Sequence, residues 1–151
     1  MTQELREVYV KFSEAIWGIN TCVVRIVAEN QDLNQYSEQQ LQTLRVIKQH
    51  PNISQIEIAS YQGVFKTAIS NRIRKLEQDG LVFIRPDKDM RKKVVSLTSK
   101  GMQLMETAEK AIYGKLNELL GSEFSKEEIL TFVGQLDRAV HCLNSKKEVE
   151  K

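Results

Sequence analysis

The chain of 151 residues is poor in cysteine, proline and glycine, with two, two and seven of them respectively. Two cysteines do not make the disulfide framework on which small secreted domains depend. With so few prolines and glycines, the sequence lacks the turn formers of a sandwich built from many short strands. We therefore expect helices to dominate, in a single domain of ordinary size.

Long apolar segments are lacking as well. The uncharged apolar runs, such as Thr21-Cys22-Val23-Val24, are only a few residues long, far shorter than the roughly 20 residues of a membrane span. The first seven residues lack the basic start and the apolar centre of a secretion signal. Hydrophobic residues make up 41% and charged residues 28% of the chain, as in folded globular proteins. We therefore expect a folded protein in the cytoplasm.

Charge is distributed unevenly along the chain. Residues 53–101 contain ten lysines and arginines against five acidic residues, a net charge of +5, whereas the rest has twelve against fifteen, a net charge of −3. A basic segment between acidic flanks is typical of a surface that binds a polyanion such as a nucleic acid.

Hydrophobic spacing predicts six helices. Apolar residues three and four apart predict one long helix over about 3–30. Three capping boxes, beginning at Ser37, Ser54 and Ser125, predict the starts of the second, third and sixth helices. The fourth helix is expected from about 65 to 79 and the fifth from about 98 to 121, each followed or closed by a glycine.

Two strand-like runs, Leu81–Arg85 and Lys93–Leu97, flank a charged loop that is rich in turn formers and predict a hairpin. A short helix, a turn, a helix and a hairpin in this order indicate a winged helix-turn-helix. The predicted fold class is therefore mainly α with a small β-hairpin wing, in a single domain of residues 1–151. Residues 37–100 would form the winged lobe, with further helices in 1–30 and 101–147.

The turn between the third and fourth helices carries a steric pattern. Ala59 provides a small side chain where two helices touch, and Gly63 suits a turn with positive φ. The residues expected to face the core are Val64, Ile69, Ile73 and Leu76. Arg72 departs from the pattern, because an apolar residue is expected near its position, and we expect Ile73 to make that contact instead.

The opposite face of the fourth helix carries side chains that can donate to phosphates or pair with base edges in a major groove. These candidate DNA-binding residues are Lys66, Thr67, Ser70, Asn71 and Arg74. A merely solvated helix face is the alternative interpretation. Solvated faces usually mix both signs of charge, whereas no acidic residue occurs from 64 to 75, and this favours groove recognition.

The hairpin loop is basic as well. Beside Arg85, its candidate DNA-binding residues are Lys88, Arg91, Lys92 and Lys93. Arginine on a narrow loop suits the minor groove, and we expect Asp89 to orient Arg91. The alternative is a solvated turn with charges of both signs, because Asp87 and Asp89 lie among the basic residues.

These segments resemble a known family. Asp89-Met90-Arg91, followed by Leu97-Thr98-Ser99-Lys100-Gly101, is similar to the Asp-x-Arg and Leu-Thr-x-x-Gly signature of the multiple-antibiotic-resistance regulator (MarR) family. Residues 69–81 resemble that family's recognition helix and its exit into the wing. The resemblance implies a homodimeric transcription regulator, usually a repressor, that binds a pseudo-palindromic DNA site. It also implies release from DNA by a small molecule or by oxidation of a thiol.

The residues themselves favour a dimer. The apolar stripes of the first, fifth and sixth predicted helices are too long for a winged core of about 60 residues to cover. A second copy of the chain is the simplest cover. Two-fold symmetry would present two recognition helices to successive major grooves, about 34–36 Å apart.

The signal sensed by such a regulator is open. Family members hold phenolic or other aromatic acids between the dimer helices and the winged lobe. Candidates for lining this effector pocket are Phe12, Trp17, Tyr36 and Arg45, although aromatic residues at helical spacing also occur in cores. Cys22 lies on the first helix, as do the cysteines of thiol-sensing members, but aligning Arg25 with their arginine puts Trp17 near that position. We expect Cys22 and Cys142 to be packing residues, with oxidation sensing as the alternative.

No metal site, cofactor or catalytic centre is predicted. His50 and His141 are the only histidines, and neither has enough neighbouring ligands for zinc. A glycine-rich phosphate loop and a Gly-x-Ser-x-Gly nucleophile elbow are missing. The remaining alternative is a winged-helix module that contacts a protein instead of DNA, although such a module has no need to exclude acidic residues.

Overall fold

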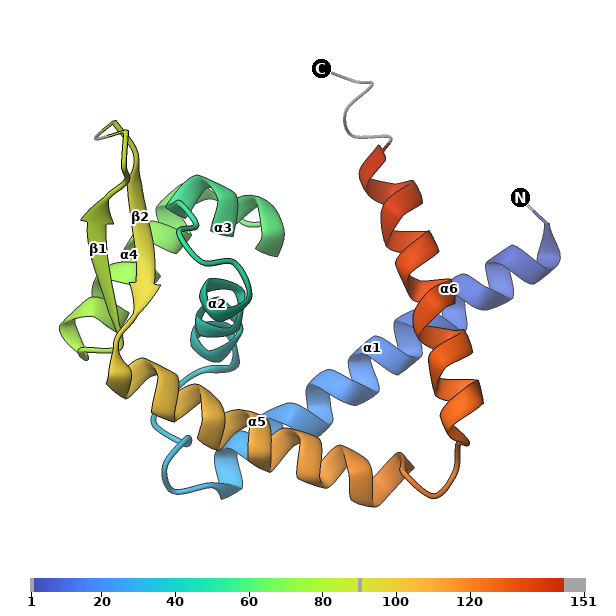
Figure 1. Ribbon diagram of the computed structural model, residues 1–151. Coiled ribbons are helices and arrows are strands. Elements are labelled where there is room, and N and C mark those ends of the chain that lie inside the picture. Colours follow the sequence, from blue (N-terminus) through green and yellow to red (C-terminus); the bar gives the residue numbers. More distant parts are fainter. Residues whose placement is uncertain (1, 90, 146–151) are drawn as a thin grey trace. The chain divides into compact units, whose positions relative to one another are not determined.

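The computed structural model describes residues 2–89 and 91–145, in two compact units of residues 1–112 and 113–151. Met90, at the centre of the wing signature, and the end of the predicted 101–147 segment lie outside the described residues. The elements are α1 (Gln3–Glu29), α2 (Glu38–Gln49), α3 (Gln55–Gln62), α4 (Lys66–Gln78), β1 (Val82–Pro86), β2 (Lys93–Leu97), α5 (Ser99–Leu120) and α6 (Lys126–Ser145) (Figure 1). The predicted fold class, mainly helical with a two-stranded wing, is confirmed.

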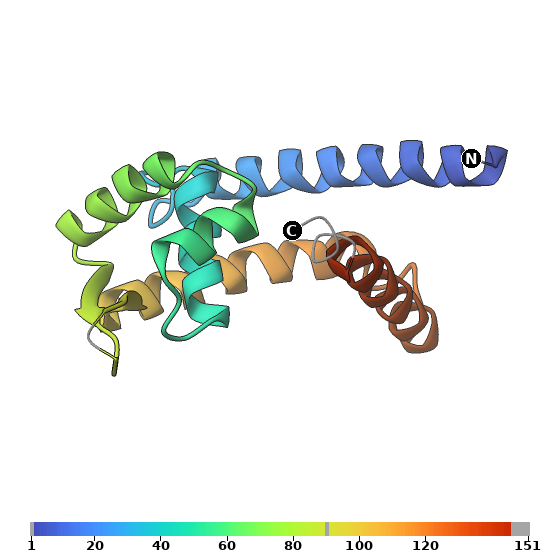
Figure 2. The same ribbon diagram turned by 90° about the horizontal axis from the view of Figure 1, so that it is seen from above.

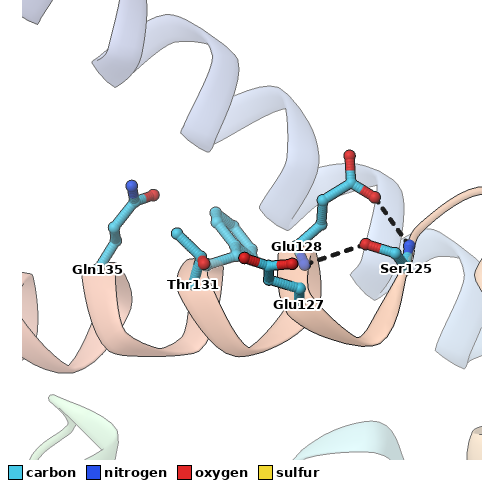
Figure 3. Close-up of a pocket in the computed structure, with 6 residues that line it drawn as sticks. Ser125, Glu127, Glu128, Thr131 and Gln135 are labelled. Carbon is cyan, nitrogen blue, oxygen red and sulfur yellow. Dashed lines mark hydrogen bonds between the residues drawn. The ribbon is translucent and has the colours of Figure 1, made fainter.

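Hydroxyl side chains begin five of the six described helices. Each of Thr2, Ser37, Ser54, Thr98 and Ser125 accepts a hydrogen bond from the backbone N–H three residues later. At the three serines the side chain of that third residue bonds back to the serine N–H, which completes the predicted capping boxes. Figure 3 shows this reciprocal pair between Ser125 and Glu128 at the start of α6. Helix α4 is the exception, because its N-cap Phe65 makes no side-chain cap bond.

The core of the first unit fills the space enclosed by α2, α3, α4 and the hairpin. Its fully buried side chains include Leu44, Ile58, Ile69, Ile73, Leu76, Leu81, Val94 and Val95. Helix α1 contributes little to this core, since Val27 is its only buried residue among those described. Figure 2 shows most of α1 extending away from the lobe.

The hairpin is antiparallel, with Val82 opposite Leu97 and Pro86 opposite Lys93. Ile53 adds one bridge, because its carbonyl accepts a hydrogen bond from the N–H of Val95 at 2.9 Å. Strand β1 begins one residue later than expected, since the N–H of Leu81 bonds to the carbonyl of Leu76 and closes the end of α4. The loop at the tip of the hairpin projects beyond the neighbouring helices (Figure 1).

The Leu-Thr-x-x-Gly segment fastens the end of α4 to the start of α5. The Thr98 hydroxyl donates to the carbonyl of Gly80 at 2.6 Å and accepts from the N–H of Gly101 at 3.0 Å. A Cβ atom on Gly101 would lie 2.1 Å from the carbonyl oxygen of Leu81, a distance that no side chain tolerates. The threonine is therefore needed for its hydroxyl, and the glycine for the close approach of two backbones.

In the second unit, none of the residues of α6 is buried. Its exposed large apolar side chains are Ile129, Leu130, Phe132, Val133, Val140 and Leu143. A shallow hollow on α6 is lined by Ser125, Glu127, Glu128, Thr131, Phe132 and Gln135, none of which is a predicted site residue (Figure 3). None of the described helices combines the length and the apolar character that crossing a membrane requires.

Candidate nucleic-acid interface

Helix α4, the predicted recognition helix, has one buried and one open face. Ile69, Ile73 and Leu76 are completely buried, as expected. Val64 was expected beside them but is 38% exposed. It lies in the turn before α4, where its N–H bonds to the carbonyl of Ala59 and closes α3, so it is outside the stripe that faces the core.

The turn itself has the predicted geometry. Ala59 is buried, and Gly63 ends α3 with φ at 63°, in the left-handed region that glycine enters without strain. Small size and backbone freedom at these two positions set the direction in which α4 leaves α3.

Four of the five predicted groove residues are exposed: Lys66, Thr67, Asn71 and Arg74. Arg74 donates from Nη2 to Oδ1 of Asn71 at 2.9 Å, so these two side chains lie together on the open face. Ser70 is half-buried, and its hydroxyl donates to Oε1 of Gln55 on α3 at 2.8 Å. Gln55 therefore joins the site, although nothing in its sequence context distinguished it from an ordinary first residue of a helix.

Arg72, at a position where an apolar residue was expected, has hydrogen-bond partners inside the lobe. It is half-buried behind α4, and its Nη1 donates to the Gln62 side-chain oxygen at 2.9 Å and to the Thr43 hydroxyl at 3.1 Å. Thr43 is fully buried on α2 and also donates to Gln62, the last residue of α3. This Arg72–Gln62–Thr43 network joins three helices of the lobe, while Ile73 makes the apolar contact that was expected of it.

The wing residues lie on an exposed, internally bonded loop. Lys88, Arg91, Lys92 and Lys93 are all exposed. The carboxylate of Asp89 accepts a hydrogen bond from the backbone N–H of Arg91 at 3.0 Å, so Asp89 fixes the backbone rather than the guanidinium of Arg91. The N–H of Asp87 donates to the carbonyl of Lys92 at 2.7 Å and closes the loop.

Two side-chain contacts fasten the wing to the helices. Lys92 Nζ lies 3.4 Å from Oε1 of Glu57 on α3, so it is paired within the lobe. The Ser54 N–H and hydroxyl, followed by Lys92, lower the pKa of Glu57. Arg85 bonds to the side chain of Asn52, which precedes α3 with φ at 64°. The Pro51-Asn52 pair signals a turn of this kind, since asparagine tolerates the left-handed region.

Comparison with known proteins places this arrangement in a family. A model of the MarR family matches residues 36–94. An uncharacterized HTH-type transcriptional regulator of Bacillus subtilis (strain 168), YdgG, is 37% identical over 95 residues, which are 60% of this chain and 62% of that protein. The chain thus spans less than two thirds of that relative. The homoprotocatechuate degradative operon repressor of Escherichia coli is 25% identical over 113 residues, 74% of this chain and 76% of that protein.

Solved structures agree on the fold. A MarR family protein from Bacillus stearothermophilus matches with a TM-score of 0.79 at 17% identity, over 95% of this chain and 99% of that one. MepR of S. aureus in its DNA complex matches with a TM-score of 0.70 at 22% identity, over 94% and 99%. The winged lobe matches the MarR family. Both relatives are named as transcription regulators.

The four residues predicted to line an effector pocket lie in different surroundings. Phe12 and Trp17 are exposed on α1, and Tyr36 packs against the core, where burial, and then the charge of Asp79, raises its pKa. Arg45 lines a small hollow of about 60 Å³ together with Ile19, Asn20, Val23, Glu38, Leu41, Gln42 and Ile112. The Nε of Arg45 is buried and has no hydrogen-bond partner among the described residues.

The cysteines and histidines of this chain are dispersed. Cys22 is half-buried on α1, whereas Cys142 is exposed rather than packed as expected, because α6 has no buried residue. His50 stacks on Tyr61 with ring centroids 4.3 Å apart. In the described ranges 2–89 and 91–145, no three histidine, cysteine or acidic residues come together as a metal site would require.

Proposed function

We propose that this protein is a MarR-family, sequence-specific DNA-binding transcription regulator of the cytoplasm. The observation that carries the proposal is the open face of α4, where Lys66, Thr67, Asn71 and Arg74 are exposed and no acidic residue occurs between 64 and 75. Such side chains suit phosphates and base edges. The exposed Lys88, Arg91 and Lys93 of the wing, with Lys92 held by Glu57, supply a second basic element.

The direct test is binding of the purified protein to DNA from upstream of its own gene, at two salt concentrations, with random DNA as competitor. We expect tight binding at two chains per site that resists the competitor and weakens steeply with salt. Binding no tighter than to random DNA would contradict recognition of this site. Absence of affinity even at low salt would contradict DNA binding and favour the protein-interaction module.

We propose that residues 37–100 form the DNA-binding lobe and that the helices in 1–30 and 101–147 form a homodimer. Leu5, Val8, Tyr9 and Trp17 are exposed along α1, and α6 separately exposes an apolar stripe. Monomeric proteins rarely leave such contiguous apolar surface open, and a second copy would cover it symmetrically. Sedimentation analysis should therefore find a dimer at micromolar concentration.

We further propose a repressor that a small aromatic acid releases from DNA by binding near Arg45. A named repressor among the relatives and the unpaired, buried Nε of Arg45 support this proposal. The hollow of about 60 Å³ is smaller than the roughly 300 Å³ of the smallest usual ligand pockets, so binding would have to separate its walls. That movement would displace the α2 wall against the α1 and α5 walls.

The test is titration of the DNA complex with benzoate, salicylate and a dihydroxyphenyl acetate. We expect at least one of them to release the DNA from the natural chain but not from Arg45→Met, with Arg25→Met, an exposed position on α1, as control. Equal release from Arg45→Met would contradict the assignment of Arg45.

Oxidation of a thiol is the second candidate signal, because Cys142 is exposed and Cys22 only half-buried. Titration of the DNA complex with peroxide distinguishes it. Identical curves for the natural chain and for Cys22→Ser would exclude Cys22 as the sensor, and Cys142→Ser tests the other thiol in the same way.

A further inference from the structure

Phe65 stands at the start of the recognition helix against two local preferences. The five other described helices begin with a serine or threonine that caps the first turn, whereas Phe65 makes no side-chain cap bond. Phenylalanine is not among the residues preferred at an N-cap. Its side chain is also 86% exposed, the highest value for a large apolar side chain in the described part of the chain.

No side-chain contact among residues 2–89 and 91–145 explains this choice of residue. The backbone carbonyl of Phe65 accepts from the N–H groups of Ala68 and Ile69, which any residue would do. A serine would make the same backbone bonds and add the missing cap. A residue that goes against local preferences and stabilises nothing in its own chain is expected at a functional site. We therefore expect the phenyl ring to contact a binding partner.

The position of Phe65 indicates what the ring meets. The N-terminal residues of a recognition helix contact base edges in the major groove. Lys66 and Thr67 follow directly, and no acidic residue occurs from 66 to 76, so the sequence around the ring suits a polyanion. The one apolar group that base edges present in the major groove is the C5-methyl group of thymine, and phenylalanine is among the residues that contact it.

We propose that Phe65 is a specificity-determining residue whose ring packs on the C5-methyl group of a thymine in each half-site of the DNA. The inference rests on the proposed DNA binding and adds to it an apolar base contact at the N-cap of α4. Phe65 thus complements the polar contacts proposed for Lys66, Thr67, Asn71 and Arg74.

The experiment selects binding sites from a random pool of double-stranded DNA with the full chain and with Phe65→Ser. The serine variant supplies the missing cap, so its melting temperature should equal or exceed that of the natural chain. We expect the natural chain to recover half-sites with a thymine at one symmetric position. Phe65→Ser should recover the same half-sites without that preference.

Replacement of this thymine by deoxyuridine removes the methyl group alone. It should weaken binding of the natural chain by about fourfold for each half-site, the effect of exposing one buried methyl group. Binding of Phe65→Ser should not change. Phe83→Ser is the matched control, because it removes a 42% exposed phenyl ring from β1 of the same lobe, and it should keep the thymine preference.

Three outcomes would overturn the proposal. If Phe65→Ser keeps the thymine preference, the ring does not read the base. If it weakens binding to all sequences equally, the ring contacts the sugar-phosphate backbone. If the natural chain recovers no common site, the proposed sequence-specific binding fails together with this inference, whereas in the first two outcomes it stands.

Discussion

The winged lobe buries its apolar side chains, whereas the outer helices α1 and α6 leave most of theirs exposed. In the lobe, Ile58, Ile69, Ile73 and Leu76 are completely buried against the chain's own residues. In α6, residues with the same helical spacing are all left open, and α1 buries only Val27. Periodicity therefore shows that a helix has an apolar face but not what covers it. The difference supports the proposal that the lobe is complete in one chain whereas the outer helices pack against a second copy.

The largest expected effect comes from charging the apolar stripe of α6. Ile129→Asp with Val133→Asp introduces two carboxylates on one face of an exposed helix. If this face is buried in a dimer, the dimer should weaken by at least about 100-fold, because truncation of central interface residues costs 2 kcal/mol or more. Operator affinity should fall with it. Analytical ultracentrifugation measures the change.

The control is Gln135→Asp, a polar exposed position on the same helix, which should leave the dimer intact. A dimer that survives Ile129→Asp with Val133→Asp would show that α6 is not the covering surface. The contrast between the lobe and the outer helices would then need a different explanation.

The next prediction compares substitutions on the two faces of α4. Arg72→Leu removes the hydrogen bonds to Gln62 and Thr43 and should destabilise the fold by about 1.5–3 kcal/mol, the range for bonds to charged groups. Arg74→Leu, on the open face, should change stability by less than about 0.5 kcal/mol but weaken DNA binding. Urea unfolding and DNA titration of both variants test this. Equal loss of stability in the two variants would contradict the division.

The wing should have a comparable effect on binding alone. Arg91→Ala should weaken operator binding by roughly 1–3 kcal/mol if the guanidinium enters a groove, with the melting temperature unchanged. If Lys93 contacts a phosphate, as proposed, Lys93→Ala should lower the slope of log affinity against log salt by about one. Fluorescence anisotropy at several salt concentrations measures both. Undiminished operator affinity in a folded Arg91→Ala protein would refute the wing assignment.

Most of the fold is predictable because its signals are local. Capping boxes at Ser37, Ser54 and Ser125 correctly predicted three helix starts. Gly63 correctly predicted the turn between α3 and α4, where its φ is positive. Each of these signals depends on atoms within four residues, so the sequence alone contains it.

The features that escaped prediction are contacts between distant segments. The Arg72–Gln62–Thr43 network spans up to 29 residues, and the Ser70–Gln55 bond joins two helices. Neither has a sequence pattern of its own. Val64 was wrongly expected in the core because the helical spacing was extended from α4 into the turn that precedes it. Asp89 was expected to orient Arg91, and its carboxylate accepts a hydrogen bond from the backbone N–H of Arg91.

The smallest expected effect concerns the link between α3 and the wing. The Ser54 N–H donates to the Glu57 carboxylate at 2.8 Å, and this bond, the Ser54 hydroxyl and Lys92 hold the pKa of Glu57 below its usual value. Because the folded pKa is lower than the unfolded one, the unfolded chain binds more protons in acid. The stability contributed by Glu57 is therefore complete above the unfolded pKa and is lost as pH falls through the folded pKa.

Glu57→Gln keeps an acceptor for the capping box but removes the charge. Since Glu57 is half-exposed, solvent screening limits the expected loss to less than about 1 kcal/mol at pH 7, and the difference from the natural chain should be smaller at pH 3. Urea unfolding at the two pH values measures it. Glu77→Gln, a carboxylate outside any capping box, serves as the control for general charge effects. A difference between the natural chain and Glu57→Gln that is equally large at both pH values would mean that the carboxylate's charge does not stabilise this junction.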